Sequence, residues 1–287
     1  MDKAPEVLLA KTAGFCPGVQ KAVDRVRRLA KAGRGPVYTL GPLVHNSQVI
    51  ARLEAEGIRA VGSLAEVEGK SGVLVLRAHG VTPELEAAAR ARGLEVVDAT
   101  CPMVKKVQAA ISRYARQGFT TVIVGDAGHA EVVGLLGYAG PDAFVVSGPE
   151  AAERLPRLDR VHLVAQTTQE SEVFRRTAAV VKRRARSAVV SDTICKPSRD
   201  RARETAALAG TVDLMIVVGA KHSANTARLA ALCRGLCPDT AAVESEADLD
   251  AAAVRTARRI GITAGASTPD WLVERVLRWV AGLRQAR

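Results

Sequence analysis

Three of the five cysteines stand in similar surroundings and are spaced almost evenly along the chain. Cys16 lies in AGFCPGV, Cys101 in DATCPMV and Cys195 in SDTICKPS, and a proline follows each of them within two residues. A structural zinc site prefers four ligands, usually in close CxxC pairs, and the chain has neither. A [4Fe–4S] cluster normally takes four thiolates, so three would leave one iron with an open position for a substrate oxygen. The three thiols therefore predict an iron–sulfur cluster that is also a Lewis acid.

Polar residues follow these cysteines at a regular interval. His45, His129 and Ser223 come 29, 28 and 28 residues after Cys16, Cys101 and Cys195. Histidine rings and hydroxyl groups donate hydrogen bonds to anions, and a charged histidine also neutralises phosphate. A second polar group follows later in each interval, and further donors lie nearby; the predicted anion pocket comprises His45, His79, His129, Ser223, Asn225 and Ser267.

One carboxylate lies inside these polar segments. Glu131 comes two residues after His129, and a carboxylic acid at that position could deliver protons to a reacting carbon or a leaving hydroxyl. Thr167, in the Gln-Thr-Thr turn, could orient that hydroxyl. His162 and His222 lie off the repeating pattern and are interpreted as structural or incidental. Cys233 and Cys237 are interpreted as small buried hydrophobic residues on one helical face.

The elements that must position these residues alternate regularly. β-Branched runs such as 73–76, 121–124 and 214–218 are typical of strands buried on both faces, and segments such as 83–92 and 170–184 have helical periodicity. Short strands at 6–10, 94–97 and 188–190 each lead into one of the three cysteines. Such alternation predicts an α/β fold with parallel sheets, whose ligands bind beyond the carboxyl ends of the strands.

The repeat of about ninety residues predicts three similar α/β units around a pseudo-threefold axis. Each unit has a small parallel sheet and gives one cysteine and two polar loops to a central cluster. The predicted boundaries are residues 16–100, residues 101–192, and residues 1–15 together with 193–287.

Composition restricts the class of protein. The 287 residues are 48% hydrophobic and 25% charged, which is typical of a globular protein. No apolar run approaches the roughly 18 residues of a membrane span, and the acidic start is unlike a signal peptide, so we expect a cytoplasmic protein with no membrane partner. The net charge is +11, but only 3% of residues are aromatic, which argues against stacking on nucleic acid bases. An odd number of cysteines also argues against a disulfide framework.

Eight motifs together resemble one known family. GFCPGVQKAV, LVHNSQVIARLEAEG, AHGVTPELEAAARARGLEVVDATCPMVKKV, GHAEVVG, QTT, DTIC, HSANTARL and TAGASTPDWLV stand in the order found in the 4-hydroxy-3-methylbut-2-enyl diphosphate reductase (IspH/LytB) family. The resemblance covers roughly residues 7 to 280.

This resemblance implies a three-domain α/β trefoil around a [4Fe–4S] cluster with three cysteine ligands, which correspond to Cys16, Cys101 and Cys195. The family removes the allylic hydroxyl of its diphosphate substrate with two electrons and two protons, giving isopentenyl and dimethylallyl diphosphates. The electron donor is ferredoxin or flavodoxin. By the same resemblance, the six donors named above form the diphosphate pocket, Glu131 is the proton-delivering acid, and Thr167 and His129 assist it.

Several positions depart from the family pattern. Ala130 and Val133 replace a proline and a glutamate, Ala224 and Ala227 replace a serine and an asparagine, and KPSRDR follows DTIC. A divergent paralogue that uses the same cluster on another small substrate is therefore an alternative. A second alternative, from another class, is a non-catalytic iron–sulfur sensor or nucleic acid binder. That class would need aromatic platforms, which are absent, and would have no use for Glu131.

Overall fold

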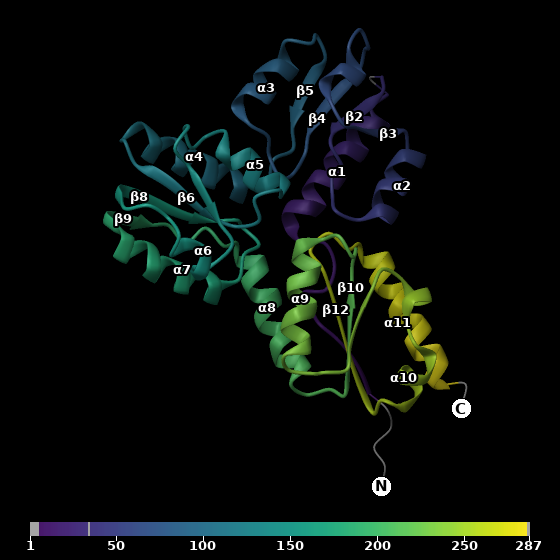
Figure 1. Cartoon of the computed structure of the whole chain (residues 1–287). Coiled ribbons are helices and arrows are strands. Elements are labelled where there is room, and N and C mark those ends of the chain that lie inside the picture. The colour runs from purple at the N-terminus through teal and green to yellow at the C-terminus, as the bar shows by residue number, and fades with distance from the viewer. Residues whose placement is uncertain (1–5, 34, 286–287) are drawn as a thin grey trace. The chain divides into compact units, whose positions relative to one another are not determined.

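Three small parallel sheets with one common strand order form the framework. The computed structural model describes residues 6–33 and 35–285 (Figure 1). One sheet has the order β3-β2-β4-β5, the next β7-β6-β8-β9, and the last β11-β10-β12-β1. The strands are β1 (Glu6–Leu9), β2 (Val37–Leu40), β3 (Ile58–Val61), β4 (Val73–Leu76), β5 (Glu95–Asp98), β6 (Thr120–Val124), β7 (Phe144–Val146), β8 (Leu158–Ala165), β9 (Ala185–Val190), β10 (Leu214–Val218), β11 (Thr240–Val243) and β12 (Arg259–Ala264).

Helices connect the strands, because adjacent parallel strands need a crossover connection. They are α1 (Pro17–Lys31), α2 (Ser47–Ala55), α3 (Pro83–Arg90), α4 (Pro102–Arg116), α5 (Ala130–Leu136), α6 (Pro149–Ala152), α7 (Ser171–Arg184), α8 (Lys196–Ala209), α9 (Ala224–Arg234), α10 (Ala251–Thr256) and α11 (Asp270–Gln285). Two 3₁₀ turns, Leu64–Val67 and Glu246–Asp248, complete the described elements.

The chain separates into two compact bodies. The first contains the residues up to Gln20, Val44–Ala51 and the chain from Lys196 onward, and it holds the sheet β11-β10-β12-β1. The second contains Lys21–Leu43 and Arg52–Cys195, and it holds the other two sheets.

In the second body, the sheet β7-β6-β8-β9 is covered on both faces. Val122, Val124, Leu163 and Ala165 face a core formed with α6 and α7, whereas Ile123 and Val164 face α4 and α5 (Figure 1). Successive strand residues point to opposite faces, so a strand covered on both sides is apolar throughout. This explains why the strand sequences show no alternation of polar and apolar residues.

In the first body, the N-terminal strand completes a sheet built from the C-terminal part of the chain. β1 pairs in parallel with β12, with Val7 opposite Ile260. Leu214, Ile216 and Val218 of β10 pack with α10 and α11 on one face, and Met215 and Val217 pack with α8 and α9 on the other (Figure 1).

The predicted α/β class with three similar small parallel sheets is confirmed. The predicted domain boundaries and the axis relating the three units stay predictions. Within the described part of the chain, no helix combines the length and the hydrophobicity that a membrane crossing requires.

Candidate active site

The three predicted cluster cysteines occupy equivalent positions beside the three sheets. Cys16 follows β1, Cys101 follows β5 and Cys195 follows β9, and each of these strands is the edge strand next to the third strand of its sheet. The backbone amide of each cysteine donates a hydrogen bond to a carbonyl two residues beyond that third strand. The bonds are Cys101 to Ala78 at 2.9 Å, Cys195 to Thr167 at 2.9 Å, and Cys16 to Ala266 at 3.0 Å. The sheet ladders therefore fix all three cysteines in the same way.

Each of these cysteines also directly precedes a helix. α1, α4 and α8 begin at Pro17, Pro102 and Lys196, and the carbonyls of Cys16 and Cys101 accept the first helical hydrogen bonds. The positive end of a helix dipole favours negative charge at this position. All three side chains are partly exposed and free of disulfides.

The other two cysteines have a different environment, as the sequence predicts. Cys233 and Cys237 are 0% and 3% exposed and belong to an apolar core with Met215 and Val217. Burial raises the pKa of the Cys233 thiol to about 11, and burial also raises the pKa of Cys237, so both remain protonated near neutral pH. The expectation of one shared helical face was wrong: α9 ends at Arg234, and Cys237 lies in the turn that follows.

A buried carboxylate is bound to the turn between β8 and α7. Glu131 is 3% exposed and Thr167 is 5% exposed. The Thr167 amide donates to Glu131 Oε1 at 2.6 Å, and the Thr167 hydroxyl donates to Oε2 at 2.7 Å. Because the Thr167 carbonyl accepts the Cys195 amide, one residue joins the acid to a predicted cluster ligand.

The same turn is fixed by the residues around it. Thr193 donates its hydroxyl to the Ala165 carbonyl at 2.6 Å and accepts the Ala165 amide at 2.8 Å. Gln166 is fully buried, and its side chain accepts the Asp126 amide at 3.1 Å. These contacts continue the pairing of β8 and β9 beyond the strand ends and so hold Thr167 in place.

Two predicted phosphate-binding histidines lie together in the second body. His129 is the N-cap of α5, and its Nδ1 accepts the Glu131 amide at 3.1 Å. A neutral imidazole with Nδ1 as acceptor carries its proton on Nε2, so the network assigns Nε2 as the donor. The His79 ring lies edge-on to the His129 ring, with centroids 5.5 Å apart.

The first body holds the remaining predicted donors. Ser223 is the N-cap of α9 and is 3% exposed, and the neighbouring Asn225 has a buried side-chain Nδ2 with no hydrogen-bond partner among the described residues. The Ser267 hydroxyl donates to the His45 carbonyl at 3.3 Å. The exposed His222 packs edge-on to His45, with centroids 6.4 Å apart. A buried amide without a partner is costly, and a bound ligand would satisfy it.

The first polar residue after each cysteine lies at the same point beyond the second strand in the order of each sheet. His45, His129 and Ser223 all come five residues after the ends of β2, β6 and β10. His129 and Ser223 are N-caps, whereas His45 lies one residue before Asn46, whose side chain accepts the Val49 amide. The regular interval between each cysteine and the next polar residue therefore reflects equivalent positions in the three sheets. The one difference is that the helix after His45 begins one residue later relative to the polar residue than the helices after His129 and Ser223.

Two residues of α8 that the sequence analysis did not single out hold the segment before Cys16. Arg201 is 4% exposed and donates to the carbonyls of Gly14, at 2.9 Å, and Ala264. Glu204 accepts the amides of Lys11 and Thr12 at 2.7 and 2.9 Å. Burial opposes ionisation of Glu204, but these hydrogen bonds outweigh it, and its pKa is lowered. Arg201 lies in the basic KPSRDR stretch, and the signal that could have found it is its helical spacing with the buried Thr205 and Ala209.

His162, interpreted from sequence as structural, supports the segment before Cys195. Its ring is fully buried, stacks on Tyr114 with centroids 4.1 Å apart, and lies 3.0 Å from the Ser191 hydroxyl. Burial, with a smaller contribution from Arg113, lowers the pKa of His162 to about 4. His162 is therefore neutral over the physiological range, and its structural role is confirmed.

Fold and site together define a three-sheet α/β protein with a cysteine after the edge strand of each sheet and a buried carboxyl group that is linked through Thr167 to the backbone of one of them. The LytB protein family matches residues 7–281 of the chain. The 4-hydroxy-3-methylbut-2-enyl diphosphate reductase of Citrifermentans bemidjiense is 44% identical over 279 residues, which is 97% of this chain and 98% of that protein. The reductase of the same name from Geobacter sulfurreducens is 45% identical over 95% of both chains.

Solved structures show the same likeness. A structure of (E)-4-hydroxy-3-methyl-but-2-enyl diphosphate reductase, described as the terminal enzyme of the non-mevalonate pathway, has a TM-score of 0.71 and 38% identity over 97% of this chain and 99% of its own. The E-1-hydroxy-2-methyl-but-2-enyl-4-diphosphate reductase of Plasmodium falciparum has a TM-score of 0.88 and 26% identity over 96% of this chain and 88% of its own. This chain belongs to the LytB family.

Proposed function

We propose that this protein reduces 4-hydroxy-3-methylbut-2-enyl diphosphate, removing its allylic hydroxyl to give isopentenyl and dimethylallyl diphosphates. The C–O bond breaks, two electrons and two protons are consumed, and the hydroxyl leaves as water. The observation that carries the proposal is the buried Glu131 carboxylate, bound by both the amide and the hydroxyl of Thr167. The names of the relatives support the same reaction.

The thiols of Cys16, Cys101 and Cys195 would hold a [4Fe–4S] cluster with one open iron site. Their chemistry fits: the three are partly exposed and occupy one equivalent position beside three sheets, whereas Cys233 and Cys237 are buried and protonated. When bound, such a cluster supplies electrons and a Lewis-acidic site for the substrate oxygen.

Glu131 would hold the proton that the departing hydroxyl needs. In the structure the Thr167 hydroxyl donates to Glu131 Oε2 at 2.7 Å. When the carboxyl is protonated, this bond would reverse: Oε2–H would donate to Thr167 Oγ1, and the Thr167 proton would pass to the leaving oxygen. The Thr167 amide keeps Glu131 in place during this exchange. A second proton, delivered to carbon, completes the balance.

The histidines and hydroxyl groups would bind the diphosphate. His129 would donate from Nε2, because its Nδ1 is already an acceptor. Asn225 Nδ2 supports the same assignment, since it is a buried donor with no described partner. His45, His79, Ser223 and Ser267 complete the proposed pocket.

Electrons would come from ferredoxin or flavodoxin, and we propose that the enzyme acts in the cytoplasm. All five cysteines are free thiols, which is typical of a reducing compartment. Neither a membrane nor a nucleic acid partner is needed for the reaction.

The test replaces Glu131 by glutamine, which keeps the shape of the side chain but cannot deliver a proton. Anaerobic enzyme is reduced with dithionite and methyl viologen, and dye oxidation is followed with the hydroxymethylbutenyl diphosphate. We expect Glu131→Gln to lower turnover by about 10²–10⁴ while substrate still binds, the usual range for general acid catalysis.

The exposed Glu172, in the same body, provides the matched control, because Glu172→Gln should leave turnover unchanged. Wild-type turnover in Glu131→Gln would refute its catalytic role. If the wild-type protein did not turn over this diphosphate, a divergent paralogue would be favoured instead.

A further inference from the structure

The solvent face of α4 carries three cations that no carboxylate of the described residues neutralises. The helix has the sequence PMVKKVQAAISRYAR, with four cations and no carboxylate. Lys106, Arg113 and Arg116 are exposed, lie on one side of the helix at spacings of seven and three, and form no ion pair among the described residues. Within the described part of the chain, Lys105 is the one cation of the four that forms an ion pair, with Asp98.

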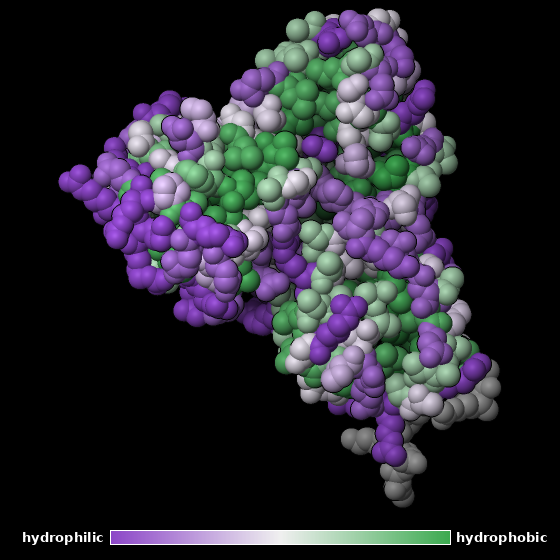
Figure 2. Space-filling view, viewed as in Figure 1, coloured by the Kyte–Doolittle hydropathy of each residue, from purple (hydrophilic) through white to green (hydrophobic). Residues whose placement is uncertain are grey.

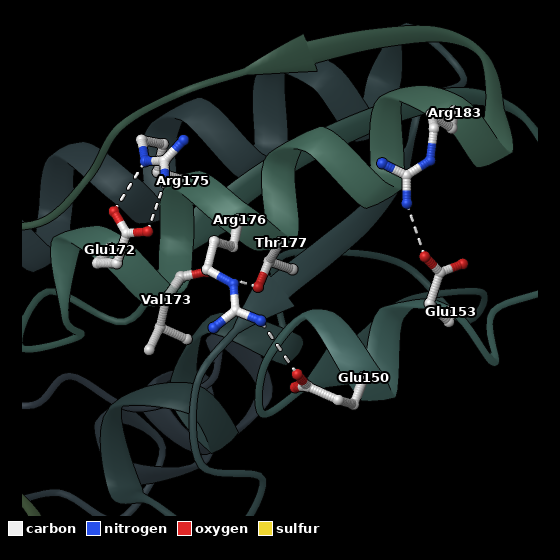
Figure 3. A network of polar contacts seen from close by, with 8 residues as sticks. All are labelled: Glu150, Glu153, Glu172, Val173, Arg175, Arg176, Thr177 and Arg183. Atoms are coloured by element: carbon white, nitrogen blue, oxygen red, sulfur yellow. Dashed lines mark hydrogen bonds and ion pairs between the residues drawn. The ribbon is translucent and has the colours of Figure 1, made fainter.

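On α7 of the same body, by contrast, most of the cations form ion pairs. On α7, Arg175 pairs with Glu172, Arg176 with Glu150 at 3.3 Å, and Arg183 with Glu153 at 2.7 Å (Figure 3). Hydrophilic residues gather over this face, as Figure 2 shows, but their charges are mixed. On α1 of the same body, Lys21, Arg25, Arg28 and Lys31 are also exposed and form no ion pair among the described residues. What distinguishes α4 is therefore its position beside the segment before Cys195, not its charge alone.

The α4 face lies beside two of the proposed cluster ligands. α4 begins directly after Cys101, so Lys106 is about 7.5 Å further along the helix axis at 1.5 Å per residue. A shallow hollow between α4 and the segment before Cys195 is lined by Lys106, Ala109, Ala110, Arg113, Tyr114 and Ser191. Ser191 is four residues from Cys195, which bounds their separation at about 14 Å.

The reaction proposed above needs an external electron source, because each turnover consumes two electrons and the product carries them away. We propose that the α4 face, centred on Lys106 and Arg113, is the docking surface for a one-electron carrier protein with an acidic surface. This inference rests on the proposed reductase function. Opposite charges steer such encounters and raise association rates by 10–10³-fold at low ionic strength.

The test compares two electron sources for the same enzyme. Lys106→Glu/Arg113→Glu reverses the charge of the face, and the matched control Arg175→Glu/Arg176→Glu makes the same change on α7. With reduced ferredoxin, we expect kcat/KM of the α4 variant to fall at least tenfold at low salt, and to approach the wild-type value as salt screens the charges. With reduced methyl viologen, two molecules of which are oxidised per hydroxyl lost, both variants should match the wild type within about twofold.

A second variant is needed because Arg113 also stacks on Tyr114, so replacing Arg113 could disturb the fold. Ala109→Glu places a carboxylate in the exposed centre of the face and removes no native contact; it should lower ferredoxin-driven kcat/KM severalfold, again without effect on the dye-driven rate.

Equal ferredoxin kinetics in the wild type and both α4 variants would overturn the proposal. So would a wild type that dye reduces but ferredoxin does not, or a loss in the α7 control equal to that in the α4 variant. Tight binding of duplex DNA at 0.15 M salt, abolished by Lys106→Glu/Arg113→Glu, would instead assign the face to nucleic acid. If the wild type showed no dye-driven turnover of the diphosphate, the proposed reductase function would be refuted, whether or not a carrier protein binds to the α4 face.

Discussion

The Thr167 hydroxyl offers a sharp test, because it can be removed while the rest of its residue stays in place. Thr167 takes part in three hydrogen bonds with other described residues: its amide and its hydroxyl donate to Glu131, and its carbonyl accepts a hydrogen bond from the Cys195 amide. Thr167→Val replaces the hydroxyl by a methyl group of similar size and keeps both backbone contacts. The substitution therefore isolates the 2.7 Å bond to Glu131 Oε2.

The size of the effect follows from burial. Both side chains are at least 95% buried, and a hydrogen bond to a charged group contributes about 1.5–3 kcal/mol. If that bond orients the acid and relays its proton, its loss should lower kcat by about 10–100-fold, at 1.36 kcal/mol per factor of ten. The free energy of unfolding should fall by a similar 1.5–3 kcal/mol, because Oε2 loses its donor without regaining water.

The assay is dye-driven turnover at saturating substrate, with iron content measured on the same samples. Thr167→Ser keeps the hydroxyl, and its turnover should stay within about threefold of the wild-type value. The iron content of Thr167→Val should equal that of the wild type and of Thr167→Ser. If the valine enzyme turned over like the serine enzyme, the hydroxyl would have no part in proton delivery. If turnover fell equally in Thr167→Val and Thr167→Ser, the cause would be altered packing of the turn and not the loss of the hydroxyl.

Three further outcomes follow from the structure. Cys101→Ser should remove most of the iron and the brown colour of anaerobic protein, whereas Cys233→Ser, in an apolar core, should retain both; equal bleaching would contradict the ligand assignment. The pKa of His162 is lowered to about 4 in the folded state, so between pH 6.5 and 4 the unfolded chain binds more protons, and stability falls as the pH falls. The loss should reach about 2 kcal/mol by pH 5, read from urea unfolding, and His162→Gln should lose less over the same range. Arg201→Met should accelerate hydrogen exchange of the amides in residues 10–16, measured by mass spectrometry, because two carbonyls lose their donor; unchanged exchange would show that Arg201 does not hold this segment.

The sequence predicted those features that repeat. The intervals between each cysteine and the next polar residue reflect a real equivalence, since His45, His129 and Ser223 all come five residues after the second strand in the order of a sheet. The fold class was predictable for a similar reason: strands covered on both faces, such as 73–76, have an unbroken apolar sequence. Glu131 was singled out as a carboxylate in a polar loop, but it lies in the first turn of α5. Its catalytic role and that of Thr167 stay predictions.

Contacts made by backbone groups could not be predicted. Arg201 donates hydrogen bonds to two backbone carbonyls. Every residue has a backbone carbonyl, so the sequence does not show which arginine of a basic stretch is buried and which is exposed to solvent. The Thr167 carbonyl that accepts the Cys195 amide was hidden in the same way. Cys237 was placed on a helix because its spacing from Cys233 fits one turn, but Gly235 and Leu236 end the helix first.

The pairing of β1 with β12 has a consequence for biosynthesis. β1 leaves the ribosome first, yet its partner residues begin at Arg259, some 250 residues later, so this pairing has very high contact order. The two sheets of the second body use strands that are complete by Val190 and can form while translation continues. Cys16, whose amide bonds to Ala266, reaches its native position only after that residue has been made. Maturation of the proposed three-thiol metal centre would therefore be post-translational, and a chain truncated before β12 would position only two of the three proposed ligands.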